Sequence, residues 1–234
     1  MEVGFMKKIS KFLIATLSAI ALSAGTAFAF QGLSIGIVGN AADFDTDGHE
    51  RIGASEKKTA GSASKSVDFP SFFVEYTAGD VGAASLTIGF EHIPGEASLG
   101  AKSRTDDNTV DDDDGTYTAK AEVEDHSTLY IEPGYQIDDM FGVYAKGGIS
   151  QVTVNSLESI AQGDDSSTYG NEDIFGYMYG IGLRANHESG LFLKLEGTQT
   201  IYETVKLNST TGNANSIRAD IEQTALKLAL GYNF

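Results

Sequence analysis

The chain has 234 residues, and its 16 basic and 33 acidic side chains give it a formal net charge of −17 at pH 7. A surface this acidic repels nucleic acid, and the absence of cysteine excludes disulfides, thiol nucleophiles and thiolate metal sites. The 27 glycines, 10 tyrosines and 13 phenylalanines against three prolines favour strands and turns over helices.

Residues 1–29 carry the pattern of a secretory signal peptide. A lysine pair precedes an apolar run, and small residues lead to a cleavage site after Ala29, as such peptides require. Met6 is the predicted start, which makes residues 1–5 an upstream extension and residues 30–234 the mature domain. A membrane anchor is the alternative, but the apolar run is shorter than the roughly 20 residues of a spanning helix.

The mature chain alternates strand-like stretches with two kinds of connection. Strands are predicted near residues 30–39, 68–77, 83–93, 119–137, 141–154, 174–186, 191–204 and 217–234. Short connections at 78–82, 138–140 and 187–190 alternate with long polar ones at 41–67, 94–118, 156–172 and 205–216. An even number of strands with alternating short and long connections is typical of bacterial outer-membrane barrels, whose short turns lie in the periplasm and whose long loops lie outside.

The predicted strands have two different faces. In the last strand the apolar side chains share one parity and the small or polar ones share the other, so they point to opposite sides. The alternating apolar set is Leu226, Leu228, Leu230, Tyr232 and Phe234. A soluble β-sandwich would show the same alternation.

Aromatic residues at the strand ends distinguish the two folds. They gather where the membrane boundaries would fall, at Tyr76, Tyr135, Phe141, Tyr232 and Phe234 on the periplasmic side and at Phe72, Phe90, Phe175 and Tyr177 on the outer side. Such girdles belong to membrane barrels, and in lipid the barrel must close to pair its backbone groups. The predicted fold is an all-β, eight-stranded antiparallel up-and-down transmembrane β-barrel.

The last eight residues, KLALGYNF, resemble the C-terminal assembly signal of outer-membrane proteins. The matching positions are a polar Lys227, Leu230, and aromatics at Tyr232 and Phe234, whereas Ala229 stands where that pattern often has glycine. The resemblance implies that the barrel-assembly machinery recognises this segment.

Residues 30–234 resemble, in pattern more than in shared residues, the small eight-stranded barrels typified by the transmembrane domain of outer membrane protein A and by opacity-protein-like surface barrels. The periplasmic domain of the full-length protein of that family has no counterpart here. The resemblance implies a monomer in the outer membrane of a Gram-negative bacterium, in contact with lipid and lipopolysaccharide.

The inward parity of the predicted strands collects equal numbers of acidic and basic side chains. They are Glu75, Glu91, Glu132 and Glu196 with Lys146, Arg184, Lys194 and Lys227. Because isolated charges are costly in a narrow lumen, we expect a paired network, with Glu132–Lys146 and Glu196–Lys227 as the predicted pairs. The network is interpreted as a structural plug, and the alternative is the ion-paired gate that the resemblance to outer membrane protein A implies.

Two acidic segments suggest cation binding. Asp43, Asp45 and Asp47 have the spacing of a calcium loop, but Ala54 stands where that loop needs its twelfth-position glutamate. An ordinary acidic segment is therefore favoured. The run 106–114 is interpreted as a solvated loop, with bridging of divalent cations to lipopolysaccharide as the alternative.

An enzymatic site is not predicted. Glu124, His126 and Ser127 offer the residue types of small lipid-modifying barrels, but adjacent strand residues face opposite sides and cannot readily share a proton. No cofactor is expected. Pro133 is predicted to mark a bulge, because proline removes a ladder donor.

The sequence therefore predicts an outer-membrane barrel that supports the envelope and presents acidic loops at the cell surface. A narrow porin for small solutes or ions is the alternative, and a lipid-modifying enzyme is the distant one.

Overall fold

The computed structural model describes residues 32–51, 58–106, 115–159, 168–210 and 215–234, which form one antiparallel sheet. Its strands are β1 (Leu33–Arg51), β2 (Lys58–Val81), β3 (Ala84–Asp106), β4 (Gly115–Gln136), β5 (Phe141–Ser159), β6 (Glu172–Asn186), β7 (Leu191–Tyr202), β8 (Val205–Asn208) and β9 (Ser216–Asn233). Within this part of the chain, no helix is long and apolar enough to cross a membrane.

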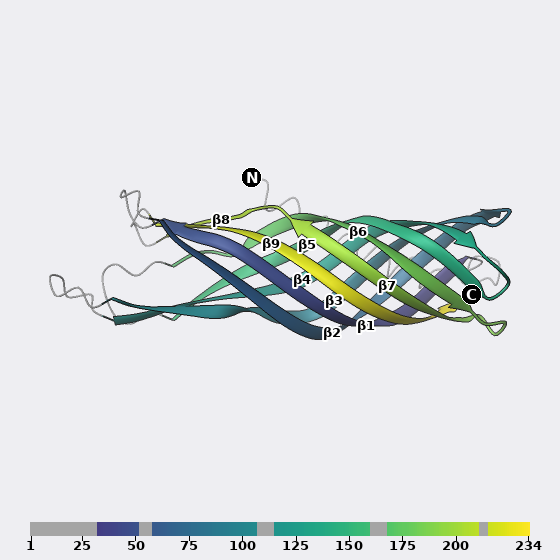
Figure 1. Cartoon of the computed structure of the whole chain (residues 1–234), viewed down its shortest axis with the longest axis horizontal. Helices are drawn as coiled ribbons and strands as arrows, with labels where there is room; N and C mark the ends of the chain where they lie inside the picture. Colours follow the sequence, from purple (N-terminus) through teal and green to yellow (C-terminus); the bar gives the residue numbers. More distant parts are fainter. Residues whose placement is uncertain (1–31, 52–57, 107–114, 160–167, 211–214) are drawn as a thin grey trace, which may run out of the picture.

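The sheet closes on itself. Each strand from β1 to β7 pairs with the next, β7 pairs with β9, and β9 returns to β1. The short β8 pairs with β9 beyond the end of β7, so it continues the same position in the ring. The predicted closed barrel of eight antiparallel strands is therefore confirmed (Figure 1).

The two ends of the barrel differ. The turn end carries the short connections β2–β3, β4–β5 and β6–β7 together with Phe234, and we call the opposite end of the barrel the loop end (Figure 1). The strands are much longer than predicted at the loop end. For example, β1 and β2 stay paired from Leu33–Tyr76 to Arg51–Lys58, so the predicted loop at 41–67 is mostly strand.

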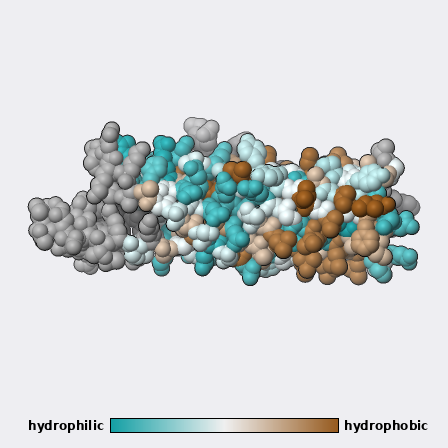
Figure 2. All heavy atoms as spheres, in the orientation of Figure 1, coloured by the Kyte–Doolittle hydropathy of each residue, from teal (hydrophilic) through white to brown (hydrophobic). Residues whose placement is uncertain are grey.

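Outward side chains near the turn end form a continuous apolar band. Large apolar side chains of the band that are at least 43% exposed include Ile35, Ile37, Phe72, Tyr76, Leu86, Ile88, Leu129, Ile131, Ile149, Tyr177, Tyr179, Ile181, Leu183, Leu193, Leu195, Ile201, Leu226, Leu228 and Leu230. Figure 2 shows this band beside the turn end, with a hydrophilic surface covering most of the rest. Such a band is what a barrel presents to lipid.

The barrel continues past the apolar band as an extension with a polar outer face. The extension comprises residues 43–51, 58–68, 94–106, 115–126, 152–159, 168–174, 203–210 and 215–223. Its interior holds an apolar cluster of buried residues: Ala42, Phe44, Leu99, Val123, Val152, Val154, Tyr169, Ile174, Tyr202, Val205, Leu207, Ile221 and Ala225. The largest hydrophobic core of the described chain thus lies inside the extension and at its junction with the band.

At the level of the band, interior rings pack against glycines of neighbouring strands. The pairs are Phe73 with Gly36, Tyr130 with Gly89, Tyr144 with Gly182 and Phe192 with Gly231. A Cβ on Gly231 would lie 2.2 Å from a ring atom of Phe192, and one on Gly182 would lie 2.3 Å from the ring of Tyr144. Glycine is therefore required wherever a ring crosses to the next strand.

The bulge predicted at Pro133 is absent, so that prediction is wrong. Ile131 lies opposite Gly147 and Gly134 lies opposite Tyr144, which is one uninterrupted register. Proline removes a single donor, and the regular pairs on both sides hold the ladder. The strand pairing shifts elsewhere, near the turn end between Ala78 and Val81 of β2, and at three places at or in the extension: Ile93/Glu96 and Ser98/Gly100 of β3 and Glu124/Ser127 of β4.

Candidate functional site

The eight charged residues singled out in the sequence converge inside the barrel at the level of the apolar band. Each comes from an inward position of one of the strands β2, β3, β4, β5, β6, β7 and β9. Seven of them are buried: Glu75, Glu91, Glu132, Lys146, Lys194, Glu196 and Lys227. The side chain of Arg184 is 16% exposed. We call this set the lumen network.

Two lysines occupy the centre of the lumen network. The Nζ atom of Lys194 lies 2.6 Å from Glu75, 2.7 Å from Glu132 and 3.4 Å from Glu196. The Nζ atom of Lys146 lies 3.1 Å from both Glu132 and Glu196, and 3.9 Å from Glu91. Glu132 and Glu196 therefore each bridge both ammonium groups, and the predicted pair Glu132–Lys146 is one of several contacts.

Lys227 and Arg184 lie at opposite ends of the network. Lys227 was predicted to pair with Glu196, its neighbour across β7 and β9, but its Nζ donates instead to both oxygens of Glu91 at 2.9 Å. Arg184 approaches Glu75 at 3.8 Å and stacks over the ring of Phe192. The side chains thus reach across the lumen rather than along the ladder.

Two tyrosines complete the network, and sequence reasoning missed both. Tyr130 donates its hydroxyl to Glu75 at 2.8 Å, and Tyr144 donates its hydroxyl to Glu196 at 2.6 Å. The available signal was an inward-facing aromatic residue beside a glycine-rich strand. These phenols supply hydrogen bonds that buried carboxylates need.

The network can hold the strands together, because equal numbers of opposite charges meet across a lumen that side chains are able to fill. Breaking one member would leave a buried charge uncompensated, which costs far more than a surface ion pair contributes.

The calcium hypothesis for Asp43, Asp45 and Asp47 is wrong in its geometry. All three lie on the outer face of the extended strand β1 instead of in a loop. Carboxylates at alternate positions of a strand run in a row rather than converging on one ion. Within the described residues, no group of three acidic or histidine side chains is arranged to hold a metal ion. The acidic run at 107–114 lies outside the described residues.

His126 and Ser127 point to opposite faces of β4. His126 contacts the hydroxyl of Tyr202 inside the barrel, whereas Ser127 contacts Nδ1 of His92 on the outer face. Glu124 lies on the far side of the β4 bulge. The structure therefore does not bring these three residues together as a catalytic set.

The segment that resembles an assembly signal comprises the last part of β9 and Phe234, which follows it. Leu230 and Tyr232 belong to the outer face, and the rings of Tyr232 and Phe234 meet edge to face with centroids 5.2 Å apart. Lys227 points inward to Glu91. The backbone NH of Phe234 donates to the carbonyl of Leu33, so the segment helps to close the barrel.

A closed antiparallel barrel with an apolar band defines an integral membrane protein of the β-barrel class. The chain belongs to the outer membrane protein beta-barrel domain family, whose model matches residues 12–234. Its location is therefore the bacterial outer membrane, where the apolar band contacts lipid.

Several solved outer membrane proteins are similar to this chain. The Escherichia coli outer membrane protease OmpT is 8% identical, with a TM-score of 0.50, 90% of this chain and 99% of that chain covered. OprG of Pseudomonas aeruginosa is 11% identical, with a TM-score of 0.49 and coverages of 88% and 98%. AlkL, solved in DMPC lipid bilayers, is 14% identical, with a TM-score of 0.49 and coverages of 90% and 94%. No curated protein matches. At such low identity the likeness to OmpT concerns the fold alone.

Proposed function

We propose that this protein is a sealed outer membrane barrel that supports the envelope and presents its extension at the cell surface. The observation that carries the proposal is the filling of the lumen at two successive levels, by the lumen network and by the apolar cluster of the extension. A conducting pore needs a continuous wet path, and both levels argue against one.

At the level of the lipid, the lumen network favours a plug. Its carboxylates are buried and are held by ammonium groups or phenols from several strands. An ion passing this level would have to break several of these contacts together, because Glu132 and Glu196 each bridge both central lysines. A charged gate that opens readily would need fewer shared contacts.

Beyond the lipid, the apolar cluster favours a second closure. Phe44, Val152 and Ile221 are each at most 5% exposed, and Val152 on β5 lies across the ring from Phe44 and Ile221 on the adjacent strands β1 and β9. A hydrated ion gains nothing there in exchange for its water, so the cluster is a barrier even when the lumen network is opened.

The outer face of the extension supports a surface role. Asp45 lies opposite Glu222 and Asp47 lies opposite Asp220 on the adjacent strands β1 and β9. Like charges directly across a ladder repel, so this face favours cationic partners, including divalent cations that bridge it to lipopolysaccharide. At the level of the apolar band, the described strands form a closed ring with no free edge for another chain to extend, which favours a monomer. His126 and Ser127 on opposite faces favour a non-enzymatic barrel.

Conductance measurements in planar bilayers test whether the lumen of the barrel is sealed. We expect the refolded protein to produce no discrete conductance steps, and we expect the Glu132→Gln, Lys146→Met double variant to remain silent as well, because the apolar cluster stays in place. A third variant that adds Val152→Ser and Ile221→Ser should leak. Steps from the unaltered protein would contradict the proposal and would support the narrow porin for small solutes.

The segment Lys227–Phe234 is proposed to act as the signal for the barrel-assembly machinery. We expect that deletion of Phe234 lowers the amount of folded barrel in the outer membrane severalfold, measured by the fraction that migrates faster on gels before heating. The same variant refolded in detergent serves as the control and should still form the barrel, because the deletion leaves the lumen network and the apolar band intact. Equal losses in cells and in detergent would argue for a stability defect instead.

A further inference from the structure

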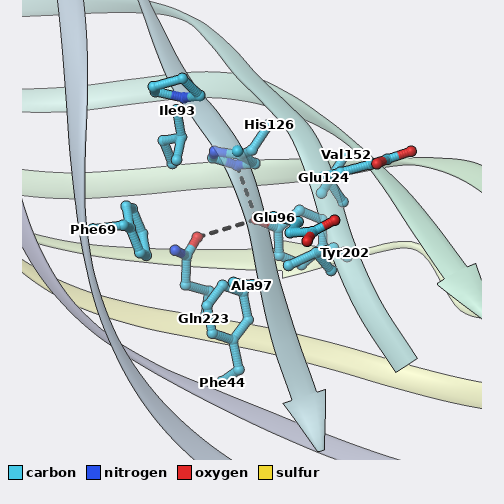
Figure 3. Close-up of a pocket in the computed structure, with 13 residues that line it drawn as sticks. Phe44, Phe69, Ile93, Glu96, Ala97, Glu124, His126, Val152, Tyr202 and Gln223 are labelled. Atoms are coloured by element: carbon cyan, nitrogen blue, oxygen red, sulfur yellow. Dashed lines mark hydrogen bonds between the residues drawn. The ribbon is translucent and has the colours of Figure 1, made fainter. Parts of the chain in front are cut away.

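The wall of the barrel is irregular just above the apolar band. Between Ile93 and Glu96 of β3 the ladder is interrupted, and β4 shifts at the same level between Glu124 and Ser127. Asp125, in that shift, is the non-glycine residue with positive φ (54°) among the described residues. The two irregularities leave a cavity of about 40 Å³ between the wall and the lumen (Figure 3).

The cavity is apolar apart from one polar corner. Phe44, Phe69, Val123 and Val152 line its inner side. At the corner, the hydroxyl of Tyr202 lies 3.0 Å from Nε2 of His126 and donates to the side-chain oxygen of Gln223 at 3.1 Å, as Figure 3 shows. Such a cavity is too small for an aromatic ring and has room for about three water-sized groups.

The polar corner contains an unused hydrogen-bond acceptor. Because Tyr202 gives its proton to Gln223, the contact with His126 requires Nε2 of His126 to be the donor. His126 lies beyond the apolar band. Burial of its ring lowers the pKa of His126 to about 4, so the ring is neutral at pH 7. Its other nitrogen, Nδ1, is then an acceptor, and it is buried without a partner. A buried acceptor of this kind gains from a donor that reaches it.

The mouth of the cavity selects against anions. Glu96 is exposed and Glu124 is partly exposed at the outer side, next to Pro94 and Gly95. A carboxylate or phosphate entering there meets like charge, and inside it finds an apolar lining. A neutral group is not repelled by the carboxylates at the mouth and loses little on entering the apolar interior.

We infer that the cavity is a binding site for the hydroxyl-bearing end of a small uncharged alcohol, whose O–H donates to Nδ1 of His126 while its first carbons fill the space beside Phe69 and Val152 and the rest of its alkyl chain extends through the mouth. This site is separate from the lumen network, and it concerns a ligand rather than the sealing of the barrel.

Three ligands of similar size test the site on the full barrel in lipid nanodiscs with ¹⁵N-labelled histidine. The chain has four histidines, and a His126→Gln variant assigns the signal. We expect 1-butanol to shift the Nδ1 resonance of His126 in a saturable way. Methyl propyl ether, which lacks the donor, should leave that resonance in place, and butyrate should not bind. An equal response to the ether would overturn the inference, because the acceptor would then take no part.

A filled cavity provides the matched control. Ala97 lines the cavity, whereas Ala101 is exposed on the same strand. We expect Ala97→Leu to weaken the butanol response about tenfold or more, since it removes both the space and access to the acceptor, and Ala101→Leu to leave it unchanged. A His126 resonance that already shows a hydrogen bond to water, and that butanol does not move, would make this a water site and overturn the proposal. The ligand series on the unaltered protein decides the question even where Ala97→Leu folds poorly.

Discussion

Replacing Lys194 by methionine is expected to lower the free energy of unfolding by about 3–5 kcal/mol, the cost of leaving buried charges without their partner. Lys194 is 2% exposed and contacts Glu75, Glu132 and Glu196. Methionine keeps the length of the side chain but removes its charge and its hydrogen bonds, so Glu75 loses its nearest ammonium group and Glu132 and Glu196 are left with Lys146 alone. Reversible urea unfolding in lipid vesicles, followed by circular dichroism, measures the loss.

Two further variants distinguish the effect of disrupting the lumen network from the general effect of replacing a lysine. Lys206 is exposed on β8, so Lys206→Met should change stability by less than about 0.5 kcal/mol. Adding Glu132→Gln to Lys194→Met removes one stranded carboxylate and should recover part of the loss. A loss below about 1 kcal/mol for Lys194→Met would show that water reaches the lysine, because exposed ion pairs contribute no more than that.

Arginine in place of Ile181 is expected to lower the free energy of unfolding by about 2–4 kcal/mol in lipid, because a charge on the lipid face near mid-membrane is that costly. Ile181 is 73% exposed and lies near the middle of the apolar band on β6. The same vesicle measurement determines the effect, and the matched control is Ser64→Arg, an exposed position of β2 in the extension. Equal effects at the two positions would contradict the placement of the apolar band in lipid.

The sequence predicted the ring of strands but not their length. The period-two pattern is clear where one face meets lipid and the other meets the lumen. In the extension, the outer face meets water, so residues such as Asp43 and Asp45 carry the polarity of a loop while they are paired in β1. The polar composition of this segment reflects its contact with water, and it does not indicate whether the backbone is paired in a strand. Backbone pairing with β2 and β9 determines that state instead.

The lumen network could be predicted as a set of positions but not as a set of contacts. The alternation of side chains along a strand shows which of them point into the barrel, and this was enough to identify all eight charged residues of the lumen network. Which of them meet depends on how long side chains cross the lumen, and Lys227 passes over its ladder neighbour Glu196 to reach Glu91. Tyr130 and Tyr144 escaped prediction because their role follows from glycines on adjacent strands, Gly89 and Gly182.

The seam between β1 and β9 has a consequence for how the chain folds. The hydroxyl of Ser34 donates to the side-chain oxygen of Asn233 at 2.6 Å, although the two residues are 199 positions apart in the sequence. Contacts between such distant positions form slowly, because a long segment must be ordered first, whereas each hairpin between neighbouring strands forms locally. Until the seam forms, β1 and β9 each expose a row of unpaired backbone groups, which readily pair with other chains. The interval before closure is therefore the period in which this protein is most prone to aggregate, and variants that weaken the seam are expected to lengthen it.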